Sequence, residues 1–198
     1  MIFDFTKLCY NAQNPYVLYT KLKIKKNLQL EMIDTVESQI ETANYYGGYT
    51  FEVEDSKNNF KKLYNTFLNI SKDLFTNEYL STYNRDTCWA NVYNRETFRS
   101  NLHHHLRTST INSVFYLKIP NDDEPNSSGL RIVHNNNDVV FVPDELEMVI
   151  MPSSMLHAPM PHNSLENRIS INMEIRYEKS IENIYLLDQI YSKCSLVL

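Results

Sequence analysis

The chain has 198 residues, 42% of them hydrophobic, and a formal net charge of −5. This length and apolar content are enough for one domain with a substantial core. Lys and Arg are scattered rather than grouped on a basic stripe, so nothing signals a nucleic-acid partner. No run of eighteen apolar residues is present, and we expect no membrane span.

Cysteine usage bears on the redox compartment. Cys9, Cys88 and Cys194 lie far apart and form no CxxC spacing. A disulfide framework and a structural zinc site are therefore both disfavoured. We expect a protein of the reducing cytoplasm, or of a host cytoplasm if the Asn-, Ile-, Lys- and Tyr-rich composition reflects a viral origin.

Residues 1–82 show mainly helical periodicity. Residues 28–44 and 60–74 have apolar side chains at spacings of three and four, which predicts two amphipathic helices. Short apolar stretches at 2–5 and 17–24 are suited to strands at a sheet edge. We expect this region to support the rest of a single domain that spans residues 1–198.

Residues 83–178 alternate between β-rich runs and polar breaks instead. Eight short strands in series are typical of a β-sandwich or a double-sheet jelly roll. The sequence thus predicts a mainly β (α+β) fold, a double-stranded β-helix with the N-terminal helices packed on one sheet. A C-terminal helix or tail would occupy 179–198. The predicted strands are 88–93, 102–107, 111–119, 130–133, 139–142, 148–151, 155–160 and 168–177.

The last predicted strand has a polar face. Arg168, Ser170, Asn172 and Glu174 alternate with apolar residues and so point the same way. His157 lies eleven residues before Arg168, a distance that allows both onto one concave surface, where a metal and an anion could bind side by side. The alternative is a half-exposed strand with its polar side in water and a core histidine.

Three consecutive histidines suggest a metal site. His103 and His105 would face the same side of a strand while His104 faces away. Together with a third imidazole from a later strand, they would make a site for a first-row metal. The run could also be a surface accident, and a slip of one residue would make His104 the ligand. We expect His134 and His162 to face solvent.

Six segments follow one another in a characteristic order and spacing: Trp89-Ala-Asn91-Val-Tyr93, His103-His-His105, Asn112-Ser-Val-Phe-Tyr116-Leu-Lys-Ile-Pro120, Ser128-Gly129-Leu130, Pro152-Ser-Ser-Met-Leu-His157 and Arg168-Ile-Ser170. Together they resemble the 2-oxoglutarate- and Fe(II)-dependent oxygenases common in phages and marine bacteria. The similarity extends over about Cys88 to Arg176. It implies a double-stranded β-helix fold.

The resemblance implies Fe(II) bound by His103 and His157, with His105 at the position where many relatives carry a carboxylate. Iron oxygenases of this kind usually have two His and one carboxylate. Either His105 therefore completes a three-His site, or a carboxylate comes from elsewhere. The loop acids available for that role are Asp122, Asp123, Glu124 and Asp138.

The resemblance also implies a site for 2-oxoglutarate as cosubstrate. Arg168 would form a bidentate salt bridge to its distal carboxylate, as suits a planar guanidinium. Ser170 would donate a hydrogen bond to the same group. Tyr93 and Asn91 would complete the pocket from the first strand of the roll, with Trp89 beside them.

On this reading His103, His157 and Arg168 are the catalytic residues of an oxygenase, most simply a hydroxylase, that acts on a small molecule or a peptide. Pairing into homodimers is a further expectation. Two other functions remain open. One is a three-His, cupin-like dioxygenase that uses no 2-oxoglutarate and binds a substrate carboxylate at Arg168. The other is a non-catalytic jelly-roll module for binding or structure.

Overall fold

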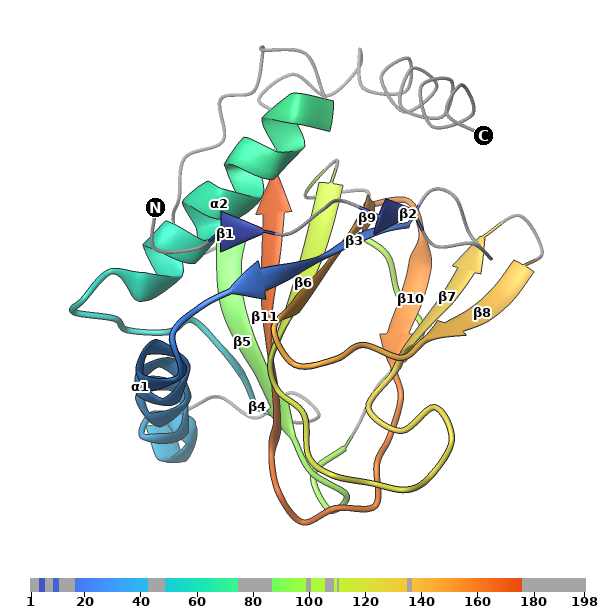
Figure 1. Ribbon diagram of the computed structural model, residues 1–198. Coiled ribbons are helices and arrows are strands. Elements are labelled where there is room, and N and C mark those ends of the chain that lie inside the picture. Colours follow the sequence, from blue (N-terminus) through green and yellow to red (C-terminus); the bar gives the residue numbers. More distant parts are fainter. Residues whose placement is uncertain are drawn as a thin grey trace.

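The computed structural model describes residues 4–5, 9–10, 17–42, 49–74, 87–98, 101–105, 109, 111–134 and 137–175. The predicted tail at 179–198 lies outside this part. The described elements form three layers: two helices, a large sheet and a small sheet (Figure 1). The predicted mainly β, double-stranded β-helix architecture is confirmed, with helices against one face of the large sheet.

The large sheet has eight antiparallel strands in the order β1-β3-β9-β6-β11-β5-β4, with β2 paired to β3. Strands from the first eighty residues occupy its edges, as the short apolar stretches predict. The three-residue strand β4 was not predicted, because it is too short to show alternation. The strands are β1 (Asp4–Phe5), β2 (Cys9–Tyr10), β3 (Leu18–Lys23), β4 (Tyr49–Phe51), β5 (Cys88–Tyr93), β6 (Ile111–Lys118), β9 (Glu147–Pro152) and β11 (Arg168–Ile175).

The small sheet has three antiparallel strands in the order β10-β7-β8. It lies across from the large sheet, on the side opposite the helices (Figure 1). Its strands are β7 (Leu130–His134), β8 (Asn137–Phe141) and β10 (Leu156–Pro159). The helices are α1 (Lys26–Glu37), the 3-10 turn η1 (Ile40–Thr42) and α2 (Asn59–Leu74).

The prediction of one helix over 28–44 is wrong in its second half, because α1 ends at Glu37. The side chains of Ser38 and Gln39 both donate to the carbonyl of Thr35, at 3.0 and 2.9 Å. They thereby satisfy a carbonyl that the end of the helix leaves free. The Gln39 amide also exchanges two hydrogen bonds with the backbone of Glu54, which redirects the chain.

Two cores lie on opposite faces of the large sheet. One joins the helices to the sheet and includes Ile169, Ile171 and Met173 of β11. The other fills the space between the two sheets, with Val114 and Val149 among its members. Because both faces of β11 are covered, Arg168, Ser170 and Glu174 are buried as well, and Asn172 is half-buried. The alternative of a strand with its polar side in water is therefore wrong.

The predicted strand over 102–107 is wrong in its described part, 102–105. Only an isolated bridge joins His103 to His157 there. The reason lies in the opposite segment, where Met155 N–H bonds to the carbonyl of Pro152 in a tight turn. A chain that turns offers no continuous ladder of partners.

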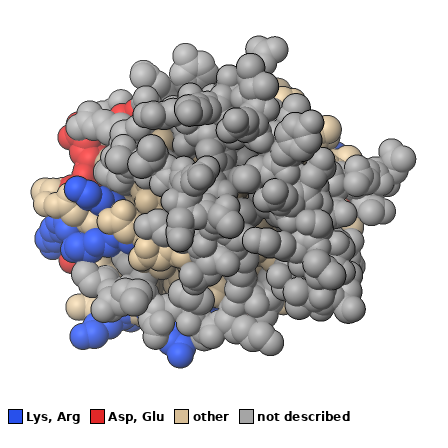
Figure 2. Space-filling model, turned by 90° about the horizontal axis from the view of Figure 1, so that it is seen from above, with Lys and Arg blue, Asp and Glu red and all other residues tan. Residues whose placement is uncertain are grey.

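Charged side chains of both signs lie next to one another along one edge of the face shown in Figure 2. The described charge on this face is therefore mixed rather than a single-sign patch. Among the described residues, no helix has the length and apolar character needed to cross a membrane.

Candidate metal and anion site

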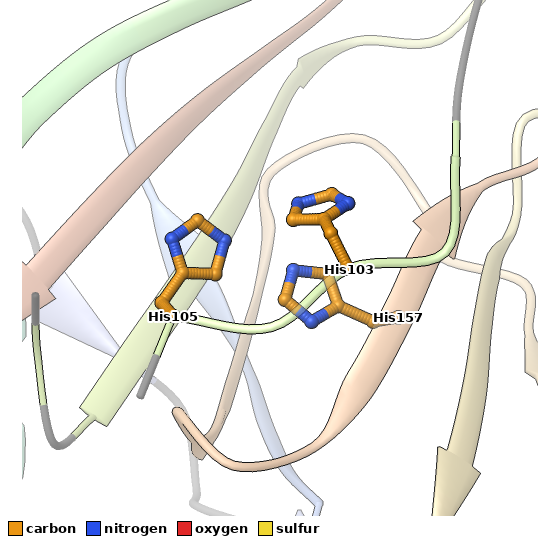
Figure 3. Close-up of side chains that lie close together, drawn as sticks. All are labelled: His103, His105 and His157. Atoms are coloured by element: carbon orange, nitrogen blue, oxygen red, sulfur yellow. The ribbon is translucent and has the colours of Figure 1, made fainter. Parts of the chain in front are cut away.

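The imidazoles of His103, His105 and His157 lie together and point toward one another (Figure 3). Each offers a nitrogen, and these three nitrogens lie within 4.8 Å of one another. The ring centroids are 4.6 to 5.2 Å apart. This spacing suits three ligands of one metal ion, with His157 buried, His105 intermediate and His103 exposed.

Backbone hydrogen bonds hold the two ligand-bearing segments together. His103 N–H donates to the carbonyl of His157 at 3.0 Å, and His157 N–H donates back at 2.8 Å. Since β10 also pairs with β7, the small sheet fixes His157 from the other side. The bridge therefore sets the distance between His103 and His157 before any ion binds.

All three rings place Nδ1 next to an acceptor oxygen. His103 Nδ1 lies 2.8 Å from the carbonyl of Asn101, and His157 Nδ1 lies 3.0 Å from that of Met155. His105 Nδ1 lies 2.6 Å from Oε1 of Glu174. A neutral imidazole that donates from Nδ1 keeps its lone pair on Nε2. The three rings are thus held in the tautomer that binds metal through Nε2.

Burial keeps His157 neutral. It lowers the pKa of His157 to about 3, chiefly because the charged imidazolium would lose its hydration. A metal ligand must be unprotonated, and this ring is unprotonated throughout the neutral range.

Glu174, which contacts His105, lies near one end of β11, and Arg168 begins the same strand at the other end. Arg168 is only 1% exposed. Its Nε donates to the carbonyl of Ser128 at 3.2 Å and Nη1 donates to Oγ of Ser170 at 3.1 Å. The guanidinium lies between the rings of Tyr93 and Tyr116, 5.0 and 4.8 Å from their centroids. No described carboxylate pairs with it, so a buried positive charge is left without a counter-anion.

Two hydroxyl groups near this guanidinium are also unused. Tyr116 Oη and Ser128 Oγ are buried, and neither donates its proton to a described residue. Burial raises the pKa of Tyr116, so its hydroxyl stays a proton donor. Buried polar groups normally have partners, and a charged guanidinium beside two unused hydroxyls fits an anion.

Strand register places three further predicted residues on this face. Tyr93 lies opposite Arg168, Asn91 opposite Ser170 and Trp89 opposite Asn172. Tyr93 donates to the carbonyl of Met160 at 2.7 Å. Asn91 accepts a bond from Thr50 at 2.9 Å, so its amide oxygen is already engaged. Trp89 lies 6.1 Å from the ring of His105, nearer the histidines than the guanidinium.

Other candidates from the sequence lie elsewhere. His104 is exposed and is not in the imidazole group. Asp138 forms an exposed pair with Arg131, and Asp122 accepts bonds from its own loop and from Asn163. No described Asp or Glu joins the group of three nitrogens. The expectation that His162 faces solvent is wrong, because it is 3% exposed and packs on Tyr93; the side chain of His134 lies outside the described part.

Comparison with known proteins gives structural matches only. No family model matches the sequence, and no curated protein does. A Pseudomonas putida prolyl-4-hydroxylase matches with a TM-score of 0.59 at 14% identity, over 82% of this chain and 93% of that one. The fold is similar to that of prolyl hydroxylases.

Two further solved structures match at the same level. A prolyl 4-hydroxylase from Phytophthora capsici has a TM-score of 0.61 at 10% identity, over 83% of this chain and 60% of the other. A Trichoplax adhaerens prolyl hydroxylase was solved in complex with a hypoxia inducible factor peptide fragment. It matches with a TM-score of 0.63 at 13% identity, over 84% of this chain and 86% of the other. At such identities the likeness to prolyl hydroxylases establishes the fold alone. The chemistry has to be argued from the residues of the site.

Sequence reasoning missed residues that hold the site in this prolyl hydroxylase-like fold. Glu174 was placed on the polar face of β11 but was given no role. Its contact with His105 joins segments 69 residues apart in the chain, and no local pattern reports that pairing. Likewise, Tyr116 and Ser128 reach Arg168 only through sheet pairing and a loop.

Proposed function

We propose that this chain is an Fe(II)- and 2-oxoglutarate-dependent oxygenase, most simply a hydroxylase. One observation carries the proposal. The inner face of β11 has a cluster of three imidazoles at its Glu174 end and a buried, unpaired guanidinium at its Arg168 end. A candidate metal-ligand set and a candidate anion anchor thus lie along the same face of β11. The phage and marine-bacterial branch that the motifs resemble is the narrower form of this proposal.

The histidines suit a resident Fe(II). His103, His105 and His157 would hold it through their Nε2 atoms, because each Nδ1 is already next to an acceptor. Imidazole is a suitable ligand for Fe(II). Acceptors on Nδ1 orient such ligands and raise their basicity.

Arg168 suits the distal carboxylate of 2-oxoglutarate. A buried charge is costly unless it is paired and hydrogen-bonded, and in the described structure Arg168 has hydrogen bonds but no anion. Ser170, Tyr116 and Ser128 would donate to the same carboxylate. Tyr93 would stack on the guanidinium and hold its plane toward the bound anion.

Each part of the site has a separate task. When bound, Fe(II), 2-oxoglutarate and O2 together supply the oxidising power that a hydroxylation needs. The three histidines would hold the metal ion through one nitrogen each. Arg168 would bind the distal carboxylate of the cosubstrate and so fix that end of it. Burial of His157 and Arg168 keeps bulk water away from the inner part of the site.

The substrate belongs to the proposal as well. One structural neighbour was solved with a peptide fragment bound, and a peptide side chain is therefore the first substrate class to test. Small molecules remain the second class.

The proposal predicts a specific optical signal. Metal-free protein is titrated anaerobically with Fe(II) and then with 2-oxoglutarate, and the weak visible metal-to-ligand charge-transfer band is followed. Wild type should develop the band. Arg168→Ala should need about 10–100 times more 2-oxoglutarate, because it loses charge-assisted hydrogen bonds worth about 1.5–3 kcal/mol. Arg168→Lys keeps the positive charge but loses the two parallel N–H donors of the guanidinium. The 2-oxoglutarate concentration that it needs should lie between those of wild type and Arg168→Ala.

Arg131→Ala is the matched control, because Arg131 is an exposed arginine of β7 that pairs with Asp138. It should behave as wild type. If iron binds without the band, a three-His dioxygenase that uses no 2-oxoglutarate becomes the better account. If Fe(II) does not bind at all, the enzyme proposal fails and the chain is a binding or structural module.

A further inference from the structure

The third histidine of the cluster differs from the other two in its Nδ1 partner. His103 and His157 face backbone carbonyls, whereas His105 faces the carboxylate of Glu174 at 2.6 Å. Glu174 is only 2% exposed. A carboxylate is the strongest of the acceptors commonly found behind a metal-bound imidazole.

The contact between His105 and Glu174 lies where a usual site of this class would have a negatively charged ligand. Non-haem iron sites of this class usually have two His and one carboxylate, so the third ligand carries one negative charge. Here His105 occupies that position, and no described acid joins the ligand group. The nearest negative charge is one hydrogen bond further out, on Glu174.

The backbone of His105 is fixed on both sides. Its N–H donates to the carbonyl of Ser153 at 2.9 Å, and its own carbonyl accepts from Ser109 N–H at 2.9 Å. The hydroxyls of Ser109 and Ser153 both donate to Oδ1 of Asn112, at 2.8 and 3.0 Å. This buried group holds the loop segment against β6.

Glu174 is held from two sides. Its backbone carbonyl accepts a hydrogen bond from the hydroxyl of Tyr64 on α2 at 2.8 Å. On the neighbouring strand β6 it is in register with Asn112, the residue that also holds the His105 segment. The strand that carries the carboxylate and the loop that carries the imidazole are thus tied to the same residue, which indicates a preorganised pair rather than a chance contact.

We infer that Glu174 is a positioning residue that replaces the missing carboxylate ligand from one shell further out. It orients His105 through Nδ1, holds the tautomer with the lone pair on Nε2, and supplies the negative charge that offsets a divalent ion. The inference rests on the proposed metal site and deepens it, because it explains how three neutral ligands would serve in place of two and a carboxylate.

Co(II) is the probe for the test, because it absorbs in the visible and does not oxidise as Fe(II) does. Glu174→Gln keeps the size of the side chain and removes the charge. It should weaken Co(II) binding by about 10–100-fold, the usual effect of losing such a partner. Circular dichroism and thermal unfolding of the metal-free variant confirm that it is folded. Glu147→Gln, the same change in a half-buried acid on β9, should bind Co(II) as wild type does.

A double-mutant cycle with His105→Ala separates the roles. If Glu174 acts mainly through His105, Glu174→Gln costs much less affinity once the imidazole is gone, because only its distant charge is then lost. A loss in the double variant as large as that in Glu174→Gln alone would mean that Glu174 does not act through His105, and the inference would be wrong. The double change His105→Asp with Glu174→Gln should recover most of the lost affinity, because it returns the charge to the ligand itself.

Failure of the inference and failure of the proposed function give different results. If wild type binds neither Co(II) nor Fe(II), the proposed function fails. If wild type binds Co(II) and Glu174→Gln binds it equally well, only the role of Glu174 is wrong. An equal loss in the Glu147→Gln control would also overturn the inference, because the effect would not be specific to Glu174.

Discussion

His162 shows how one buried side chain can make stability depend on pH. Its Nε2 lies 3.3 Å from the carbonyl of Tyr93, and its Nδ1 is buried without a described partner. Loss of hydration lowers the pKa of His162, and the nearby charge of Arg168 lowers it further. The folded state therefore holds a neutral ring at pH values where the unfolded state, with a pKa of about 6.5, is protonated.

The sign of the effect follows directly. Below pH of about 6.5 the unfolded state binds a proton that the folded state does not, so the free energy of unfolding falls as the pH falls toward the folded pKa. The contribution of one such group is at most about 1.4 kcal/mol per pH unit. Urea unfolding of metal-free protein at several pH values gives the free energy of unfolding as a function of pH. As the pH falls below about 6.5, this free energy should fall less steeply for His162→Gln, which can still donate to the Tyr93 carbonyl, than for wild type. The same pH dependence in both proteins would refute this.

At the scale of elements, the turn before β7 allows no side chain at Gly129. A Cβ there would lie 2.8 Å from Cγ1 of Val140 and 2.9 Å from the backbone oxygen of Asn126. The backbone oxygen cannot rotate away, so the turn itself has to shift. Gly129→Ala should lower the free energy of unfolding by about 1–3 kcal/mol.

The same shift should reach the anion site, because the carbonyl of Ser128 accepts from Arg168. On the proposed function, weaker 2-oxoglutarate binding is therefore expected together with the lower stability, as measured by titration and by denaturant unfolding. Asp123→Ala, at an exposed position in the same loop, should change stability by no more than about 0.5 kcal/mol. A fully stable Gly129→Ala variant would show that the turn can shift at little cost to accept a side chain.

At the scale of the whole molecule, the helices and the histidines lie on opposite sides of the large sheet, and the hydrogen bond from Tyr64 to the Glu174 carbonyl links the two sides. Phe67 on α2 is fully buried between the helices and the large sheet. Its ring packs edge-on against that of Tyr64, with the two ring centroids 6.0 Å apart. The histidines lie on the other side of that sheet. Phe67→Ala should cost about 3–5 kcal/mol of unfolding free energy.

In the fraction of Phe67→Ala that stays folded at low temperature, Co(II) affinity should remain near that of wild type. Phe67→Leu is the milder variant for this measurement, and Asn65→Ala is the exposed control on the same helix. A loss of affinity that parallels the loss of stability would show that the helix layer also positions the ligands.

The sequence by itself determined the periodic features. Alternation predicted β5 with its bounds and most of the other strands, because a covered sheet face requires an apolar residue at every second position. It also put Arg168, Ser170, Asn172 and Glu174 on one face. The helix over 60–74 was predicted for the same reason, with a period of 3.6.

Only the tertiary structure decided which faces and segments meet. The His105–Glu174 contact, the Arg168 surroundings and the burial of His162 all depend on strand register and loop paths, and neither is encoded in local periodicity. The strand expected at 102–107 failed for a related reason, because a ladder needs a partner and the opposite chain turns at Pro152. Periodicity reports what each residue prefers locally, whereas a site is made by residues that are distant in the chain.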